Sequence, residues 1–423
     1  MGISNEFVSA YHDKGFTTAI KWAARNAILS GFQSRTYALV NALSPIIHDK
    51  SDIEERLRSN GSIEYYSQGQ DVTISPPIGS DHPEILSERS GSYSISRPFV
   101  GEIRDVHLFG SYPIPICQRG RIVLESVVSP PIFVLNLGYS MRELLDTTSW
   151  ERSGSSPREI DLGVLLYNRW NRGYYHWTAE TLTVLEGVEQ YAKRNGETPK
   201  LIVGPELNRY QQQSLKLLGY GSEDLIKWDR FYGRVNRFVV PSIRRELNLG
   251  ETSPVAYWWL RNRMLEAATD AAPDVSDEAS SYVYLSREDA PRRRVKNEEE
   301  VLDVLGPYGF EKYVLSDRSV AENVELFAQA DVIVGPHGAG LTDIIYSTDA
   351  TVIELFRSND VRPTYYVLSE QLGHRYRYLC CEYEGPNLVV DTTRLEEIVA
   401  NEIDVLGNDS VAGPTNMPEV SSD

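Results

Sequence analysis

Short apolar, β-branched runs alternate with amphipathic segments from residue 162 onward, and this alternation constrains the fold most. A repeated strand-and-helix pattern is typical of parallel sheets flanked by helices. We therefore expect an α/β fold with two Rossmann-like units, whose parallel sheets face a central cleft. In the first unit we expect strands at Leu162–Tyr167, Lys200–Val203 and Asp224–Lys227, and helices at His176–Lys193 and Arg209–Leu218. In the second we expect strands at Tyr282–Leu285, Glu311–Leu315, Val332–Val334, Val352–Phe356 and Tyr376–Cys381, and helices at Asn297–Leu305, Val320–Ala330, Leu341–Tyr346, Pro363–Leu372 and Thr392–Ile403.

The chain has 423 residues, more than a single hydrophobic core usually serves. We divide it into an N-terminal helical extension and connector (1–90), a first Rossmann-like domain (91–250), a second one (251–405) and a flexible tail (406–423). The segment Ser51–Arg97 is polar and rich in Ser, Gly and Pro, which indicates the connector. Short β-branched runs between Val100 and Val134 indicate further strands, and a long helix at Pro254–Ala268 should join the two units.

The chain carries 60 acidic and 42 basic residues, a formal charge of -18. A surface of this sign repels nucleic-acid phosphates, so we expect no nucleic-acid partner. Only nine of the basic residues are lysines, and an acidic, lysine-poor surface favours a salt-rich cytosol. We therefore expect a halophilic protein, with a GC-rich genome that favours arginine codons as the alternative. Three cysteines, two of them adjacent, favour neither a disulfide scaffold nor a cysteine-based zinc site.

No apolar run reaches the length of about 18 residues that a spanning helix needs. The first residues lack a secretory pattern, so we expect a cytoplasmic protein. The segment from Phe16 to Leu43 combines basic with apolar residues, and predicts helices that contact the inner face of the cell membrane peripherally. Packing of these helices on the body of the protein is the alternative.

A glycine-rich turn follows the apolar strand at Val332–Val334 and precedes a helix. Its glycines, Gly338 and Gly340, let the backbone approach a ligand, and the amides at a helix N-terminus favour a phosphate. His337, inside the turn, is well placed to donate to a pyrophosphate. The alternative is that the turn serves packing alone.

A cluster of arginines follows the strand at Tyr282–Leu285. Arg287 comes first, and Arg292, Arg293, Arg294 and Lys296 form the densest positive run of the chain. Parallel strands end at one edge of a sheet, so these cations and the glycine turn should converge on one anionic ligand. The alternative is a solvated run paired with the glutamates at 298–300. The Walker lysine motif and an N-terminal Gly-x-Gly-x-x-Gly are both absent, which disfavours nucleotide hydrolysis and dinucleotide-dependent oxidation.

Three further residues carry candidate chemistry. His176 and Glu180 share one face of a predicted helix at the carboxyl end of a strand, so one can act as a general base that the other orients. A zinc pair lacks a third ligand, and a hydrogen-bonded structural histidine is the alternative. Glu354 lies within an apolar strand, where a carboxylate needs a partner. Ribose hydroxyls are one candidate partner, and the cap of a neighbouring helix is the other.

Together these motifs resemble glycosyltransferase family 61. The resemblance rests on Tyr282-Val-Tyr-Leu-Ser286-Arg287 with Arg294 and Asn297-Glu298, on Val334-Gly-Pro-His337-Gly-Ala-Gly-Leu341-Thr342, and on Asn168 through Trp177, and it covers about Leu162–Phe356. It implies a GT-B-like enzyme with two Rossmann-like domains, which transfers a sugar with inversion from a nucleotide-diphosphate sugar and needs no obligatory metal or other cofactor.

The resemblance also implies roles for individual residues. Arg287 and Arg294 would contact the donor phosphates, His337 with the turn Gly338–Gly340 would support the pyrophosphate, and His176 would line the acceptor side. One position departs from the family, which usually carries Asn where this chain has Asp343.

We therefore expect a prokaryotic, haloarchaeal-like member of the family. It would be an inverting hexosyl- or pentosyltransferase that assembles surface polysaccharide or glycan, with a glycan or lipid-linked glycan as acceptor. A nucleotide-sugar epimerase of the same architecture is one alternative. A catalytically inactive scaffold protein is the other, and Asp343 is its main support.

Overall fold

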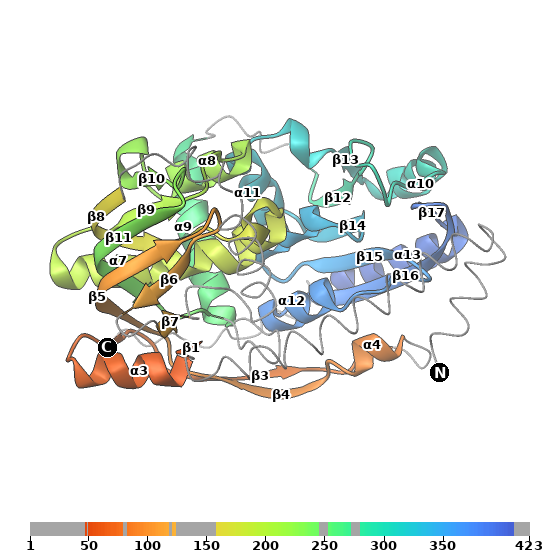
Figure 1. The fold of residues 1–423 in the computed structure, drawn as a ribbon. Coiled ribbons are helices and arrows are strands. Elements are labelled where there is room, and N and C mark those ends of the chain that lie inside the picture. The colour runs from red at the N-terminus through yellow and green to blue at the C-terminus, as the bar shows by residue number, and fades with distance from the viewer. Residues whose placement is uncertain are drawn as a thin grey trace, which may run out of the picture.

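The structure, a computed structural model, describes residues 47–48, 50–78, 83–117, 121–123, 158–244, 253–271 and 280–409. Two large sheets lie side by side, with helices packed between them and on their outer faces (Figure 1). The described part of the chain is therefore an α/β protein. The expected N-terminal membrane-contacting helices and the end of the expected tail lie outside the described residues.

The first sheet has nine strands within the described residues, in the order β1-β7-β6-β5-β11-β8-β9-β10, with β2 also paired to β5. They are β1 (Ile47–His48), β2 (Glu64–Tyr65), β5 (Phe99–Phe109), β6 (Ile114–Cys117), β7 (Arg121–Val123), β8 (Arg158–Leu165), β9 (Lys200–Val203), β10 (Leu225–Lys227) and β11 (Tyr232–Pro241).

Only one half of this sheet is parallel as predicted. Strands β11, β8, β9 and β10 are parallel neighbours, whereas β5 pairs antiparallel with both β11 and β6. The connection between β5 and β6 is short, and a short connection permits only antiparallel pairing, because a parallel pair needs a crossover of about a dozen residues or more. The first sheet is thus mixed rather than wholly parallel.

The segment Ser51–Arg97, interpreted from sequence as a connector, contains regular structure. It contributes α3 (Lys50–Ser59), β2, the hairpin of β3 (Gln70–Ile74) and β4 (Gly91–Ile95), and α4 (Glu84–Ser87). The hairpin lies along α12 (Thr364–Leu372) of the second unit, where the Ser75 amide donates to Glu370 over 3.1 Å (Figure 1). Only alternate residues of β3 are apolar and buried, which makes the segment polar on average. The hairpin ties the two units together.

The second sheet agrees more closely with the prediction. Its order is β13-β12-β14-β15-β16-β17, and the first five strands are parallel. They are β12 (Tyr282–Leu285), β13 (Glu311–Tyr313), β14 (Val332–Pro336), β15 (Thr351–Arg357) and β16 (Arg375–Glu384), with β17 (Asn387–Val389) antiparallel at the edge. Counted from β12, the parallel order is 2-1-3-4-5, that of a doubly wound sheet. In such a sheet ligands bind where the strand order reverses, here between β12 and β14.

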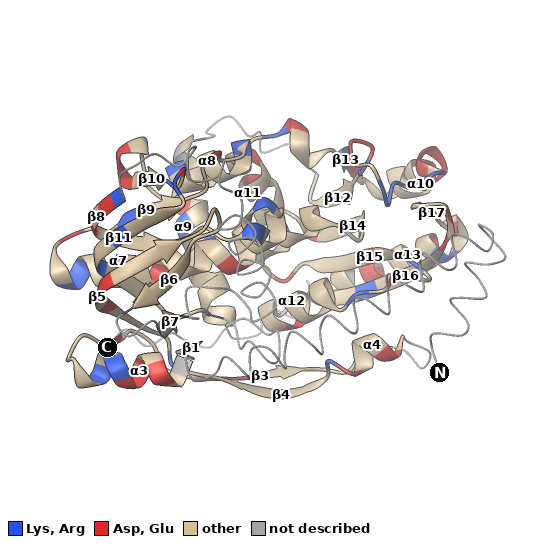
Figure 2. Cartoon of the chain, in the orientation of Figure 1, with Lys and Arg blue, Asp and Glu red and all other residues tan. Residues whose placement is uncertain are grey.

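Helices cover both faces of the second sheet. Residues of α10 (Glu298–Leu305) and α13 (Thr392–Asp409) pack on one face. Residues of α11 (Val320–Ala328) and α12 pack on the other, between the sheets. Acidic residues gather on the outer helix α10 (Figure 2). Helix α13 continues to Asp409, so the expected tail begins as helix.

The helix expected at His176–Lys193 is broken into three pieces. A π-helical turn, η5 (His176–Thr181), is followed by a 3₁₀ turn, η6 (Leu182–Val184), and then by α7 (Leu185–Asn195). The Thr181 hydroxyl donates to the carbonyl of His176 over 3.1 Å, and such bonds compete with the regular helical ladder. Single π-helical turns often occur at functional sites.

One hydrophobic cluster fills the space between the two sheets. Helix α9 (Pro254–Ala271), the predicted joining helix, lies at its centre and contacts helices of both units. Its buried residues Tyr257, Leu260, Met264 and Ala268 recur at helical spacing. The same cluster includes Val164 of the first sheet and residues of the second sheet and of the β3–β4 hairpin. The two units therefore share a core.

We predict that Leu260→Ala destabilises both units together. Leu260 is fully buried in the shared core, so the truncation should cost about 2–5 kcal/mol of unfolding free energy. Urea unfolding followed by fluorescence and circular dichroism should show one transition, displaced as a whole. Val405→Ala, at an exposed position of α13, is the control and should shift the transition little. Two separate transitions, of which only one moves, would contradict a shared core.

Candidate functional site

A cavity of about 400 Å³ opens at the carboxyl ends of β12, β13 and β14. This is the point where the strand order of the second sheet reverses. The first unit also contributes to its wall, so the cavity lies between the units. Its lining comprises Tyr174, Arg209, Tyr210 and Gln213 of the first unit and Leu285, Ser286, Arg287, Asp289, Leu315, Ser316, Arg318, Val320, Asn323, Pro336, Ala339, Gly340, Leu341 and Asp343 of the second.

Arg287 and the glycine turn meet in this cavity, as the sequence predicts. A methyl group placed on Gly338 would overlap Nη1 of Arg287, so the guanidinium rests directly against the glycine backbone. Gly340 also lines the cavity, and a methyl group there would lie 2.9 Å from Leu315. Burial lowers the pKa of Arg287, but an arginine remains charged at neutral pH. A half-buried cation thus stands beside the first turn of a helix.

That helix, η10 (Ala339–Tyr346), is 3₁₀ throughout. The first amides of a helix have no partner within it, and they point towards the space in front of its N-terminus. Together with the guanidinium of Arg287 they offer an anion several donors at once.

The carboxylate of Glu354 holds the imidazole of His337. Its Nδ1 bonds to Oε1 of Glu354, and the Tyr376 hydroxyl donates to Oε2 of the same carboxylate over 2.6 Å. The imidazole also stacks on Phe356, with ring centroids 5.4 Å apart. His337 is buried and does not itself belong to the lining of the cavity, so this pair lies behind the glycine turn.

Glu354 therefore supports His337 rather than reaching a ribose. The carboxylate is fully buried and has a partner on each oxygen. It also does not belong to the lining of the cavity. The sequence singles out Glu354 correctly as an acidic residue that needs a partner, but the partner is the histidine that follows the neighbouring strand β14.

Two neighbouring arginines of the run, Arg293 and Arg294, differ in their burial and in their partners. Arg293 is half-buried, donates to the His337 carbonyl over 3.3 Å and lies 3.7 Å from Asp360. Arg294 is exposed and donates to the Ala290 carbonyl over 2.5 Å. Arg293, to which the sequence analysis gave no role of its own, is thus the arginine of this run that reaches the glycine turn. Arg293 also has a left-handed backbone conformation, with a φ of 59°.

The alternative interpretation of the run, pairing with the glutamates of α10, is not what the described residues show. Glu298 instead accepts hydrogen bonds from Ser286 (2.8 Å) and Lys312 (2.8 Å). In the described part of the chain, no ion pair joins Arg292, Arg293 or Arg294 to residues 298–300.

Four buried polar atoms around the cavity have no hydrogen-bond partner. Two are donors and two are acceptors, and they belong to residues of the lining: Nε of Arg287, Nε of Arg318, Oδ1 of Asn323 and Oδ2 of Asp343. Nδ2 of Asn323 donates to the Leu315 carbonyl over 3.2 Å, which fixes the amide so that Oδ1 is the atom left over. Buried polar groups without partners are costly, and a bound ligand is one way to satisfy them.

Arg318 and Asn323, which line the cavity, were not predicted from the sequence. They lie after β13 and on α11, outside any motif, and only the folded topology brings them beside the glycine turn.

His176 and Glu180 form the predicted pair. Nδ1 of His176 lies 2.8 Å from Oε2 of Glu180, which is almost fully buried. The imidazole itself is partly exposed, and the Trp170 ring stands edge-on to it at 4.6 Å. A carboxylate at Nδ1 favours the tautomer in which Nε2 is unprotonated, which is the arrangement of an oriented general base.

His176 lies outside the lining of the cavity but close to it along the chain. Tyr174 lines the cavity, and Tyr175 contacts both His176 (5.5 Å between ring centroids) and Tyr365 (6.1 Å). Tyr365 in turn lies 5.4 Å from the ring of His337. Two tyrosine rings thus connect the two histidines across the junction of the units.

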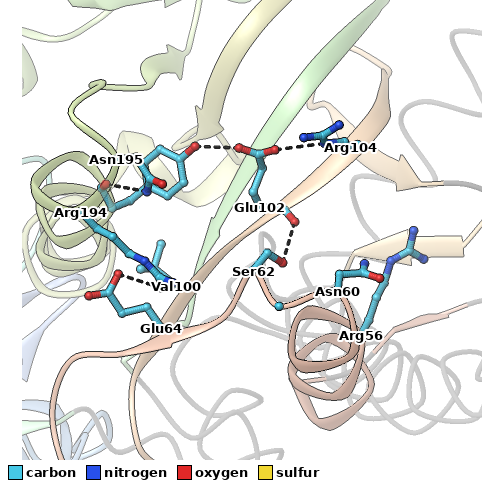
Figure 3. Close-up of a pocket in the computed structure, with 11 residues that line it drawn as sticks. Arg56, Asn60, Ser62, Glu64, Val100, Glu102, Arg104, Arg194 and Asn195 are labelled. Carbon is cyan, nitrogen blue, oxygen red and sulfur yellow. Dashed lines mark hydrogen bonds and ion pairs between the residues drawn. The ribbon is translucent and has the colours of Figure 1, made fainter.

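A second cavity, of about 520 Å³, is larger and also includes a partnerless buried atom, Nε of Arg56, but it does not adjoin the glycine turn. It lies against α3, β2, β5 and the end of α7 (Figure 3), and none of its lining residues belongs to the second sheet. Its two carboxylates are already engaged, because Tyr191 donates to Glu102 (2.7 Å) and Arg194 to Glu64 (3.4 Å). We therefore assign ligand binding to the cavity at the strand ends.

Within the described residues, no helix is both long and apolar enough to cross a membrane. No group of three or more His, Cys, Asp and Glu side chains in this part of the chain could hold a metal ion.

The fold and the site define a doubly wound α/β protein with a cavity between two units, lined by Arg287 and the glycine turn. Parts of this chain are similar to known proteins. Residues 174–353 match the family model of glycosyltransferase 61. A stretch of 166 residues is 31% identical to the beta-1,2-xylosyltransferase of Arabidopsis thaliana, and it covers 33% of this chain and 30% of that protein. The similarity thus spans under a third of the relative's length. Together the two findings support a glycosyltransferase of family 61.

We predict that Gly338→Ala impairs anion binding without removing any charge. The added methyl group would displace the Arg287 guanidinium, a flexible group that can move without unfolding the chain. Loss of a charge-assisted hydrogen bond should weaken binding of a nucleoside diphosphate about tenfold or more. Gly306→Ala is the control, because a methyl group there meets nothing within 4 Å. Calorimetry on both variants checks this, and equal affinities would contradict the placement of Arg287.

Proposed function

We propose that this protein is an inverting glycosyltransferase that takes a sugar from a nucleotide-diphosphate sugar. The observation that carries the proposal is the cavity between the units, where Arg287 rests on Gly338 beside the start of η10. The partnerless atoms around this cavity include both donors and acceptors, which suits a nucleotide sugar better than a simple anion. We further propose that the two units form a GT-B arrangement, with the donor held mainly by the second.

In the proposed reaction an acceptor hydroxyl attacks the anomeric carbon of the donor sugar. The bond from that carbon to the diphosphate oxygen breaks, and its electron pair leaves with the diphosphate. Nε2 of His176 takes the hydroxyl proton, with Glu180 holding the imidazole through Nδ1. Arg287 and the amides at the start of η10 stabilise the charge on the departing diphosphate, and His337 supports them from the glycine turn. Attack opposite the leaving group inverts the anomeric centre.

The donor sugar is a pentose or a hexose in this proposal. The similarity to a xylosyltransferase favours a pentose. We propose a glycan or lipid-linked glycan as acceptor and a role in surface polysaccharide or glycan assembly on the cytoplasmic side, in a halophilic prokaryote. Peripheral membrane contact through the N-terminal helices belongs to the same proposal.

We predict that Arg287→Ala weakens nucleotide binding and that Arg294→Ala does not. Arg287 lines the cavity, whereas Arg294 is exposed and bonded to a backbone carbonyl. Loss of a half-buried cation facing a diphosphate should weaken binding about tenfold to a hundredfold. Titration calorimetry with UDP and GDP measures both variants against the unmodified protein. If the two variants lose affinity equally, the assignment of the cavity is wrong.

We predict that His176→Ala lowers kcat about 100-fold or more while it changes nucleotide affinity little. The imidazole lies outside the cavity but is oriented as a base, and general base catalysis contributes about 10²–10⁴-fold. Glu180→Gln should lower kcat less, because it removes the orienting charge but retains the hydrogen bond. Rates of nucleotide release with a glycan acceptor check both variants. A His176→Ala enzyme with undiminished kcat would exclude His176 as the base.

Two alternatives predict different products. An epimerase would convert the donor sugar with no acceptor present, and product analysis by chromatography separates this from transfer. An inactive scaffold would fold normally and show no rise in melting temperature with any nucleotide sugar, whereas a bound donor stabilises a fold by mass action.

A further inference from the structure

Asp343 is a buried carboxyl in the wall of the cavity to which we assign the donor. It has no exposed surface. The Tyr174 hydroxyl of the first unit donates to its Oδ1 over 2.6 Å, which links the two units across the cavity. Oδ2 has no hydrogen-bond partner. No cation is paired with Asp343 among the ion pairs and hydrogen bonds of the described residues.

The position of Asp343 on η10 places it behind the glycine turn. In a 3₁₀ helix residues three apart lie on the same side, about 6 Å from one another along the axis. Gly340, Asp343 and Tyr346 follow this spacing. An ionised Asp343 would therefore stand close behind the diphosphate that we place at the start of the same helix. Two like charges in a cavity with little water repel each other strongly.

We propose that Asp343 acts as a neutral carboxylic acid, so that the nucleotide donor binds with one proton held on this side chain. In this form Oδ1 accepts from Tyr174 and Oδ2 carries the proton. Oδ2 then becomes a hydrogen-bond donor in the wall of the donor cavity. A carboxylic acid kept neutral by its surroundings can serve as such a donor. This inference rests on the function proposed above.

The surroundings of Asp343 support the neutral form. Burial raises the pKa of Asp343 to about 7. The hydrogen bond from Tyr174 lowers the pKa, but it offsets only part of the effect of burial. Burial also holds the pKa of Tyr346 well above its usual range, so this neighbour carries no charge at neutral pH. The usual pKa of an aspartate is about 3.9.

The other titratable groups packed around η10 are engaged elsewhere. Arg261 of α9 donates to the Ser347 carbonyl over 2.7 Å, and Tyr365 of α12 lies 3.4 Å from the Thr342 hydroxyl. His374 bonds to the Ile344 carbonyl, and burial lowers its pKa to about 4, so it is neutral. The titratable groups that line the cavity together with Asp343 and Tyr174 are Arg209, Tyr210, Arg287, Asp289 and Arg318.

The linkage between proton binding and nucleotide binding determines how the affinity for the nucleotide changes with pH. Above about pH 7 the free protein loses the proton from Asp343, and binding of the diphosphate must restore it. Affinity should therefore fall as the pH rises through this range, by as much as about tenfold for each pH unit. An amide in place of the acid cannot ionise, so Asp343→Asn should remove this component. Tyr174→Phe removes a bond that favours the charged form, so it should move the fall in affinity to higher pH.

The test is titration calorimetry with UDP and GDP from about pH 6 to about pH 8.5. We expect the ratio of the Asp343→Asn association constant to that of the unmodified protein to rise about tenfold or more over this range. The comparison cancels the titration of the nucleotide phosphates, which is common to both proteins. A structural role for Asp343 would change both affinities but leave their ratio constant.

A second measurement needs no variant. At about pH 8 the unmodified protein should take up close to one proton on binding, beyond the uptake of the nucleotide itself, as measured in buffers of different ionisation enthalpy. If the nucleotides bind with a constant ratio and without this uptake, the inference about Asp343 fails while the proposed function stands. If neither nucleotide binds at any pH, the proposed function fails and the inference fails with it.

Discussion

The core shared by the two units is the constraint on which the rest of the structure depends. Helix α9 packs against helices of both units, and the β3–β4 hairpin reaches from the first unit to α12. Burial of apolar surface is the main stabilising contribution in folding, roughly 25 cal/mol per Å². A continuous core between the sheets therefore fixes how the carboxyl ends of the second sheet face Tyr174 and Tyr175. The cavity exists because this core ends at that edge.

Within this arrangement, a few direct contacts hold the residues of the candidate site in position. The absence of a side chain at Gly338 makes room for Arg287, and the buried carboxylate of Glu354 orients His337. A second carboxylate, Glu180, orients His176 in the first unit. In each histidine a carboxylate thus holds Nδ1. The same pairing occurs on both sides of the junction, although the two histidines belong to unrelated local structures, a strand end and a π-helical turn.

The sequence predicted the second unit well because its strands are buried on both faces and read as continuous apolar runs. It also identified Arg287, the glycine turn and the His176–Glu180 pair, since each belongs to a local pattern. The sequence did not predict the pairing of strands that lie far apart in the chain. Nor did it predict the direction of side chains whose orientation depends on the fold. The antiparallel pairing of β5 with β6 depends on their short connection, Arg293 and Arg294 are neighbours that differ in burial and in partners, and Asn323 reaches the cavity from another helix. No local pattern carries that information.

The formal charge of -18 and an anionic ligand are compatible because charge acts over short distances in salt. At physiological ionic strength exposed charges are screened beyond about 8 Å, whereas buried charges are screened much less. The acidic surface thus has little influence on the cavity, and the buried groups determine its potential. There the cation of Arg287 shares the cavity wall with a carboxyl, Asp343, whose burial opposes ionisation. A site of this kind can bind a diphosphate inside an acidic protein, provided that Asp343, the buried acid in the cavity wall, stays neutral.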